Sequence, residues 1–185
     1  MSKPYKALIQ ACAAQKPQAQ RELYQLFAPR LFAVCCRYAA SEAEAEDILQ
    51  ESFIKIFQKI SSYEESGSLE GWLRRIVVNT AIDHLRRQKQ QKNRASEREA
   101  VEIPAADDVI ADLEAEQLIL LIQQLPDGYR MVFNLYAVEG YSHAEIGKQL
   151  GITESTSRSQ YTRARALLRE NLNQIYHQSY VYKDV

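Results

Sequence analysis

Glycine, proline and cysteine are scarce in this sequence of 185 residues, which contains 6, 5 and 3 of them. Because glycine and proline are the strongest turn formers, their scarcity predicts a mostly helical chain. Three cysteines provide no disulfide framework, which indicates a reducing, cytoplasmic environment. Cys35 and Cys36 are adjacent, and core packing is their simplest role, with redox sensing as the alternative.

Long apolar runs are also missing. The longest one, residues 31–36, has 6 residues, whereas a membrane span needs about 20. The N-terminal residues contain no apolar segment of the kind found in a secretory signal. We therefore expect a cytoplasmic protein without membrane insertion.

Residue combinations that indicate catalysis or a cofactor are missing as well. The three histidines have no ligand spacing to one another or to the cysteines, and no glycine-rich phosphate loop occurs. An acidic cluster at Glu44, Glu46 and Asp47 has no basic or nucleophilic companion. We therefore predict no enzymatic activity, no metal site and no cofactor.

A polar stretch with few large apolar residues divides the sequence near residues 88–112. It is basic at first and then acidic, and it cannot bury enough apolar surface to offset the entropy of ordering it. We predict an all-α protein with two small helical domains, residues 1–90 and 113–185, joined by a flexible linker over 91–112. The alternative is one helical bundle with a long surface loop.

The N-terminal block contains apolar residues at helical spacing. Leu23, Leu26, Phe27 and Leu31 predict one buried helix face, and Pro29 within this pattern predicts a kink or a helix boundary. A turn-rich loop is expected over residues 61–68. No strand-like alternation continues for long.

Residues 46–58 are predicted to form a helix with two different faces. The apolar face consists of Leu49, Phe53, Ile56 and, farther on, Ile60. The other face is acidic and amide-rich with an exposed isoleucine in its middle, which is typical of a surface for a partner; a merely solvated face is the alternative. The members of this outer face are Asp47, Gln50, Glu51, Ile54 and Gln58.

A basic helix is predicted over residues 71–87. Arg75, Asn79 and Arg86 fall on one side of it, next to the turn-rich loop. Cations can follow the phosphates of single-stranded DNA while a loop encloses an unstacked base. A solvated basic helix is the alternative. Because the net charge is only −1, DNA binding would rest on such local basic faces.

A helix–turn–helix is predicted in the last third of the chain. Ser142 and Glu145 have the spacing of a capping box. Gly151 tolerates the positive φ of a tight turn, and Thr153 caps the second helix. Gly147 leaves room for that second helix to approach.

The second helix has a packed side and a polar side. Ser157, Tyr161, Ala164 and Leu168 recur at the spacing of the packed face. Arginine and hydroxyl side chains share another face, which suits a reader of the DNA major groove because guanidinium groups bind phosphates or guanine edges. A solvated arginine face is the alternative. The predicted duplex-DNA residues are Arg158, Ser159, Thr162 and Arg163.

Together these segments resemble the bacterial RNA polymerase sigma factors of the extracytoplasmic-function (ECF) type, in the sigma-70 family. The resemblance covers roughly residues 8–175 and rests on the stretches 47–57, 72–81, 125–130 and 141–165 in this order. It implies two helical domains, called regions 2 and 4, and a protein that directs promoter-specific transcription initiation. The C-terminal block would contact the β flap of core RNA polymerase. An anti-sigma factor is a further candidate partner.

The resemblance also assigns roles to individual positions. Asp47, Gln50 and Glu51 match the residues by which region 2 binds the β′ clamp helices of core RNA polymerase. The isoleucine in the middle of the same face, Ile54, is added to this predicted interface. For the single-stranded −10 element of promoter DNA, the resemblance implies the loop of residues 63–69, with Tyr63 and Ser66, and also Asn79. The basic side of the predicted helix adds Arg75 and Arg86 to this set. The residues that would read the duplex −35 element are Arg158, Ser159, Thr162 and Arg163.

Two residues depart from the family pattern. Ser157 stands on the packed side where an apolar residue is usual, and Gln160 replaces a frequent basic residue. Both bear on which −35 sequence is read, because a hydroxyl on the packed side alters how the recognition helix sits.

Two other classes of protein fit parts of the pattern. An ordinary helix–turn–helix regulator with an N-terminal sensing domain would bind duplex DNA without polymerase, but it leaves the outer face of residues 46–58 without a role. A protein–protein adaptor made of helical bundles would show no DNA effect when Arg158 or Arg163 is changed.

Overall fold

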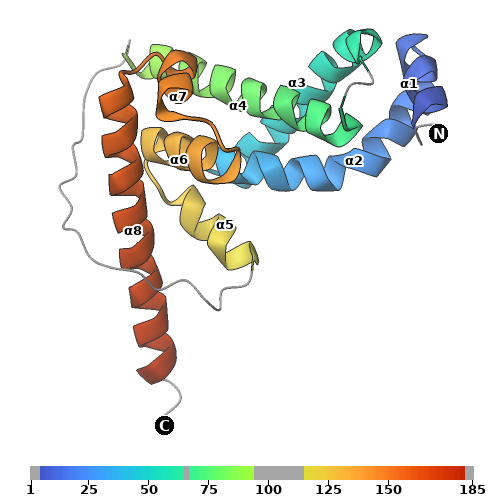
Figure 1. Ribbon diagram of the computed structural model, residues 1–185. Helices are drawn as coiled ribbons and strands as arrows, with labels where there is room; N and C mark the ends of the chain where they lie inside the picture. The colour runs from blue at the N-terminus through green and yellow to red at the C-terminus, as the bar shows by residue number, and fades with distance from the viewer. Residues whose placement is uncertain (1–4, 65–66, 94–114, 182–185) are drawn as a thin grey trace. The chain divides into compact units, whose positions relative to one another are not determined.

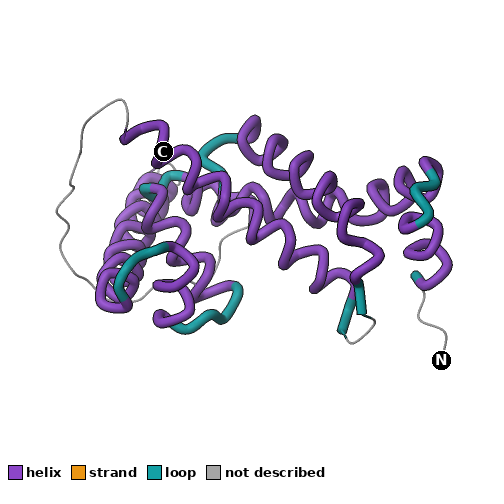
Figure 2. The backbone as a smooth tube through the Cα atoms, turned by 90° about the horizontal axis from the view of Figure 1, so that it is seen from above, coloured by secondary structure: helices purple, strands orange, loops and turns teal. Residues whose placement is uncertain are grey.

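The computed structural model describes residues 5–64, 67–93 and 115–181, and helices account for most of them (Figure 1). Within these ranges the backbone consists of helices and loops without a strand (Figure 2), so the all-α prediction is confirmed. None of the helices in these ranges is long and apolar enough to cross a bilayer. Residues 91–93 of the predicted linker are helical, and its remainder lies outside the described residues.

The chain divides into two compact units, residues 1–84 and 85–185, each with its own core. The helices of the N-terminal block are α1 (Lys6–Ala13), α2 (Pro17–Tyr38), α3 (Glu42–Lys59), the 3₁₀ turn η1 (Ile60–Ser62) and α4 (Leu69–Asn93). Those of the C-terminal block are α5 (Ala115–Gln123), α6 (Asp127–Phe133), the π-helical turn η2 (Asn134–Val138), α7 (His143–Leu150) and α8 (Glu154–Val181).

In the first unit, α2 packs along α3, and α1 packs on α2 and η1. The apolar face predicted for α3 is buried from Leu49 to Ile60. The helix begins after Ser41, whose hydroxyl accepts a hydrogen bond from the Glu44 N–H at 3.2 Å. This cap satisfies one of the free N–H groups at the start of the helix and thereby fixes the register of the buried face.

Of the two alternatives at Pro29, the helix boundary is excluded, and the expected burial of Leu26 is wrong. The helix has no boundary at Pro29 and continues through it to Tyr38. Leu26 is 47% exposed, whereas its neighbours Leu23, Phe27 and Leu31 are buried. Consecutive helical residues are turned by about 100° from each other, so Leu26 cannot share the centre of the face that Phe27 occupies.

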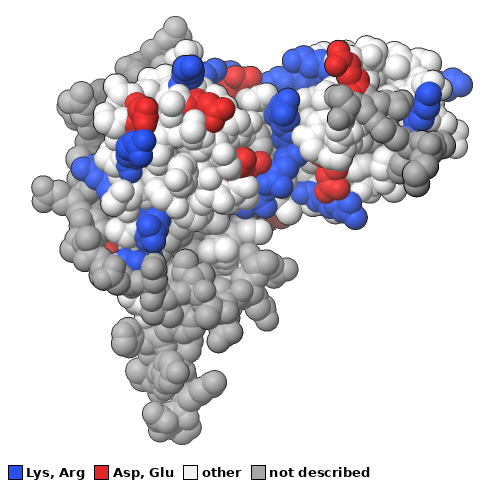
Figure 3. Space-filling model, viewed as in Figure 1, with Lys and Arg blue, Asp and Glu red and all other residues white. Residues whose placement is uncertain are grey.

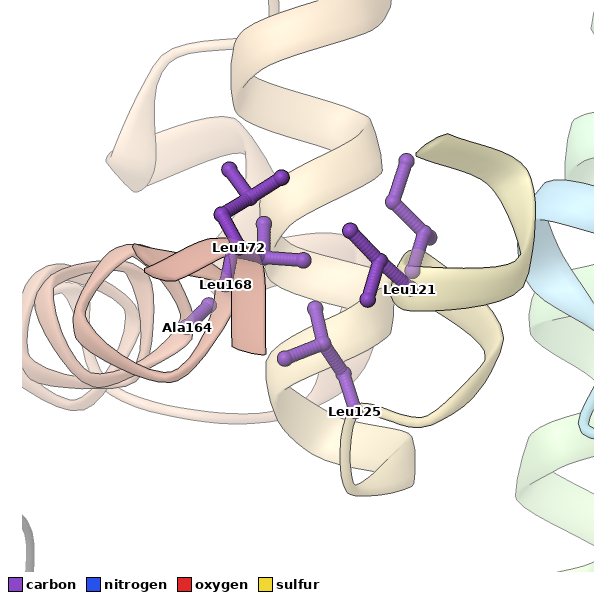
Figure 4. Close-up of a cluster of buried hydrophobic side chains, with 6 residues drawn as sticks. Leu121, Leu125, Ala164, Leu168 and Leu172 are labelled. Carbon is purple, nitrogen blue, oxygen red and sulfur yellow. The ribbon is translucent and has the colours of Figure 1, made fainter. Parts of the chain in front are cut away.

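In the second unit, α5 and α8 enclose an apolar core. Leu121 of α5 and Leu125, just after its end, point toward Ala164, Leu168 and Leu172 of α8 (Figure 4). All of these side chains are buried. Because Leu172 belongs to this core, the packed part of α8 extends well beyond the helix–turn–helix.

A buried arginine closes the end of α5. Arg130 is 3% exposed and donates hydrogen bonds to the carbonyl groups of Gln123 at 2.9 Å and Leu125 at 2.8 Å. Its guanidinium also pairs with Asp127 at 2.8 Å. The last carbonyl groups of a helix have no partner within the helix. Arg130 therefore serves as the carboxyl-terminal cap of α5 and joins it to α6.

The helix–turn–helix of α7 and α8 has the predicted caps. The Ser142 hydroxyl accepts from the Glu145 N–H at 3.3 Å, and the Glu145 carboxylate accepts from the Ser142 N–H at 2.8 Å, which confirms the capping box. The Thr153 hydroxyl accepts from the Thr156 N–H at 3.1 Å and caps α8.

Two glycines close the turn between α7 and α8. Gly151 has a φ of +67°, which glycine adopts without strain. A Cβ atom at Gly147 would lie 2.8 Å from the carbonyl oxygen of Ile152. The turn can therefore fold back over α7 only where the side chain at 147 is absent.

Candidate DNA and partner interfaces

The four residues predicted to read duplex DNA lie together on the exposed side of α8. On the opposite side, Ser157, Ala164 and Leu168 are buried, so the predicted division of α8 into two faces is confirmed. The hydroxyl groups of Ser159 and Thr162 donate to carbonyl groups of α8 itself. Their oxygen atoms keep lone pairs that can accept hydrogen bonds from a ligand.

Both arginines of this face have a local partner. The Glu154 carboxylate accepts from Arg158 Nη2 at 2.5 Å and from Arg158 Nε at 3.2 Å. Arg163 Nη1 donates to the hydroxyl group of Tyr129 on α6 at 3.3 Å. A phosphate or a base edge that binds Arg158 must therefore compete with the carboxylate of Glu154.

The two departures from the family pattern point into the protein. Ser157 is 0% exposed and its hydroxyl lies 2.9 Å from His143 Nδ1 on α7. Gln160 is half-buried and packs on Gly128 of α6, where an added Cβ atom would lie 3.3 Å from Gln160 Nε2. Neither residue belongs to the exposed face of α8.

A hollow lies where the loop after η1 meets the start of α4. Tyr63, Trp72 and Arg75 line it, together with Ser68 and residues of the loop. The rings of Tyr63 and Trp72 meet edge to face, with their centroids 5.6 Å apart. The Tyr63 hydroxyl donates to the Gly67 carbonyl at 2.6 Å and so closes the loop. This small site presents two aromatic rings beside a cation.

The remaining residues predicted for single-stranded DNA follow α4. Arg75, Asn79 and Arg86 are all exposed on this helix. Ser66 lies outside the described residues. Trp72 was missed as a site residue because it has the helical spacing of the apolar residues Leu69, Leu73 and Ile76, which is typical of a core position. Its position beside a turn-rich loop, as the one tryptophan of the sequence, was the available indication.

The outer face of α3 is formed as predicted. Asp47, Gln50 and Ile54 are exposed, and Ile54 has 58% of its surface exposed. Glu51 is half-buried, and its carboxylate pairs with Lys55 at 3.0 Å. Lys55 also contacts Asp83 of α4 at 3.2 Å. Glu51 is therefore held partly by contacts within the fold. The other four members of this face, Gln58 among them, are exposed.

An apolar hollow between α2 and α3 adjoins this face. Its lining includes Tyr24, Phe32, Leu49 and Gln50. Tyr24 and Leu26 are among the most exposed large hydrophobic residues of the described chain. The sequence did not indicate this surface, because outward apolar residues of α2 have nearly the same spacing as its core residues.

Charged side chains of both signs lie on the surface, whereas the Cys35 thiol is buried. Basic and acidic side chains are interspersed on the face shown in Figure 3. Burial raises the pKa of the Cys35 thiol to about 12, with a further contribution from Cys36, so this thiol is protonated at neutral pH. Among the described residues, no three His, Cys, Asp or Glu side chains could hold a metal ion together.

Two families of known sequences match the two halves of the chain. Residues 23–91 match sigma-70 region 2, and residues 115–168 match sigma-70, region 4. The ECF RNA polymerase sigma factor SigW of Bacillus subtilis is 30% identical over 166 residues, which cover 83% of this chain and 89% of SigW. The chain belongs to the ECF class of the sigma-70 family.

Other relatives agree with this assignment of the sigma factor. The RNA polymerase sigma factor CarQ of Myxococcus xanthus is 34% identical over 160 residues, covering 85% of this chain and 91% of CarQ. The ECF RNA polymerase sigma factor SigE of Mycolicibacterium smegmatis is 33% identical over 161 residues, covering 82% of this chain and 60% of SigE. The predicted family and its role in transcription initiation are confirmed, and an ordinary helix–turn–helix regulator is not favoured.

A solved structure shares the fold of this sigma factor. It is the co-crystal structure of the sigma factor RpoE with the anti-sigma factor NepR from Bartonella quintana. The TM-score is 0.51 at 22% sequence identity, with 83% of this chain and 96% of that chain covered. At this identity the likeness concerns the fold alone.

Proposed function

We propose that this sigma factor binds core RNA polymerase through the outer face of α3 and recognises two promoter elements with separate domains. Region 2, residues 1–90, would act on the −10 element, and region 4, residues 113–185, on the −35 element, with residues 91–112 joining them. The observation that carries the proposal is the formation of three exposed faces on α3, α4 and α8, each with chemistry suited to one of these ligands.

The face of α8 supports duplex recognition in the major groove. Arg158 and Arg163 supply guanidinium groups that bind guanine edges or phosphates, and Ser159 and Thr162 are small enough to allow a close approach. The residues that hold α8 in place lie on its other side. Binding DNA therefore requires no repacking of the region 4 core.

The hollow at the start of α4 supports recognition of an unpaired −10 base. The rings of Tyr63 and Trp72 offer a stacking surface, which stabilises an unstacked base whatever its identity. Asn79 adds an amide that can pair with a base edge, while Arg75 and Arg86 attract the phosphates.

Partners other than DNA follow from the same assignment. The exposed residues Asp47, Gln50 and Ile54, with Glu51, would bind the β′ clamp helices, and region 4 would contact the β flap. The apolar hollow beside α3 offers further surface, and an anti-sigma factor is a third candidate partner, because the RpoE structure of the same fold contains one. We place the protein in the cytoplasm with RNA polymerase and assign it no catalytic activity.

Transcription by core polymerase tests the proposal. Core RNA polymerase with the purified chain is expected to initiate at the promoter of the chain's own gene, whereas core polymerase alone is not. Equal transcription without the chain would contradict the proposal. Tight binding of promoter duplex by the chain alone, with no effect on transcription by the core enzyme, would instead indicate an ordinary regulator.

The ion pair of Arg158 gives two variants with opposite expected effects. Arg158→Ala should weaken binding of the −35 duplex by the holoenzyme about 5- to 100-fold and relax preference at one base pair. Glu154→Gln should strengthen binding about 2- to 5-fold, because it removes the carboxylate that holds Arg158 and repels phosphates. Binding is measured by titration of a labelled duplex taken from a promoter that the wild-type holoenzyme transcribes.

Matched controls separate this effect from a general change of charge. Arg21→Ala on α2 and Glu170→Gln farther along α8 change the same residue types at other exposed positions. Both should leave duplex binding within about twofold of wild type. A Glu154→Gln variant that binds more weakly than wild type would show that Glu154 is not a competitor of DNA.

A further inference from the structure

A polar contact joins the two helices of the helix–turn–helix inside their packed interface. His143 is the first residue of α7 and is 8% exposed, and Ser157 on α8 is fully buried. His143 Nδ1 and the Ser157 hydroxyl are 2.9 Å apart. Burying either group without a hydrogen-bond partner would be costly, so the two residues depend on each other.

Aromatic rings hold the imidazole in its place. Tyr136 on the π-helical turn stacks on the His143 ring, with the centroids 4.2 Å apart and the planes at 9°. Tyr161 lies one turn beyond Ser157 on α8. Its ring centroid is 4.5 Å from that of Tyr136 and 5.8 Å from that of His143. Since π-helical turns are rare, the one at 134–138 is a specific feature, and it carries Tyr136 at its centre.

This contact is adjacent to the DNA face. Ser157 directly precedes Arg158 and Ser159 in α8. A hydrogen bond has a preferred distance and direction, whereas an apolar contact in the same place tolerates sliding and rotation. A rotation of α8 at Ser157 moves the side chains at 158 and 159 with it, because they belong to the same helical turn.

We propose that the His143–Ser157 hydrogen bond sets the position of α8, so that both are positioning residues that determine which −35 sequence is read. The proposal rests on the duplex-DNA role of the exposed α8 face. It also explains why a serine stands at position 157, where an apolar residue is usual: a polar pair between α7 and α8 replaces an apolar contact there.

Protonation of His143 provides an independent measurement. Burial lowers the pKa of His143, Arg158 lowers it further, and Glu154 acts in the opposite direction; Tyr136 and Tyr161 are the other titratable groups against the ring. The unfolded chain, with an ordinary pKa of about 6.5, then binds the proton more readily. Stability should therefore fall as the pH drops from about 6.5 toward the lowered pKa.

Three variants of the full chain test the proposal. Ser157→Val and His143→Leu each leave one buried polar group without its partner, and the double variant replaces both by apolar groups. Each single variant is expected to bind the wild-type −35 duplex about tenfold more weakly as holoenzyme. The double variant should regain thermal stability, yet select a different −35 sequence from a pool of randomised duplexes.

The outcomes distinguish positioning from support of the fold. If the double variant selects the wild-type sequence, or if the single effects are additive, the pair does not position α8. If a single variant unfolds, the −35 sequence selected by the folded double variant decides whether the pair positions α8. Variants with His143→Leu should also lose the part of the stability change that begins near pH 6.5, while the part due to Glu145, whose pKa is lowered by its hydrogen bonds with Ser142, remains at more acidic pH. An unaltered onset near pH 6.5 would contradict burial of a titrating His143. Failure of wild-type holoenzyme to bind any duplex would refute the DNA role instead.

Discussion

Asp47→Lys combined with Ile54→Ala is expected to reduce the affinity of the sigma factor for core RNA polymerase by at least about tenfold. The two residues lie on the outer face of α3, and both are exposed, so the substitutions leave the core of the first unit intact. Asp47→Lys reverses a charge that would face a cationic partner. Ile54→Ala removes an apolar side chain from the centre of the face. The measurement is co-purification with core enzyme, followed by titration.

The structure changes the choice of residues for this experiment. Glu51→Lys would also break the ion pair with Lys55, which in turn contacts Asp83 of α4, so a loss of binding would have two explanations. Glu22→Lys on the exposed side of α2 is a matched control for the charge change at Asp47. It should retain binding within about twofold. Unchanged co-purification of the double variant would remove α3 from the polymerase interface.

Asn79→Ala is expected to abolish most transcription from a duplex promoter while the holoenzyme keeps its affinity for an isolated −35 duplex. Asn79 is exposed on α4, on the same side as Arg75 of the aromatic hollow. Loss of an amide that pairs with a base edge costs about 1–3 kcal/mol, or roughly 5- to 150-fold. Open-complex formation is measured by the reactivity of unpaired bases in the −10 region.

A promoter with a pre-melted −10 region separates two roles of Asn79. If Asn79 reads a base, the pre-melted template should restore little of the loss, because the base contact is still missing. Nearly full recovery on that template would show instead that Asn79 assists strand separation. Gln18→Ala, an amide truncation at an exposed position of α2, is the control and should transcribe at the wild-type rate. A wild-type rate for Asn79→Ala on duplex DNA would rule out its −10 role.

Features that depend on residues close in sequence were determined by the sequence itself. The capping box of Ser142 and Glu145, the left-handed Gly151 and the two faces of α8 all follow from spacings of three or four residues. In these cases helical geometry alone decides which groups meet. For the same reason the outer face of α3 could be predicted before its partner was considered.

Contacts between separate elements were decided only by the tertiary structure. The spacing in α2 could not show that Leu26 is exposed while Phe27 is buried, since this depends on which side of the helix α3 covers. The hydrogen bond of Ser157 with His143 spans 14 residues and requires the docking of α8 on α7. Docking is a collective outcome of core packing, and no local spacing encodes it. The sequence therefore determined which residues of α8 share its outward face, and the packing of the helices decided how those residues are held.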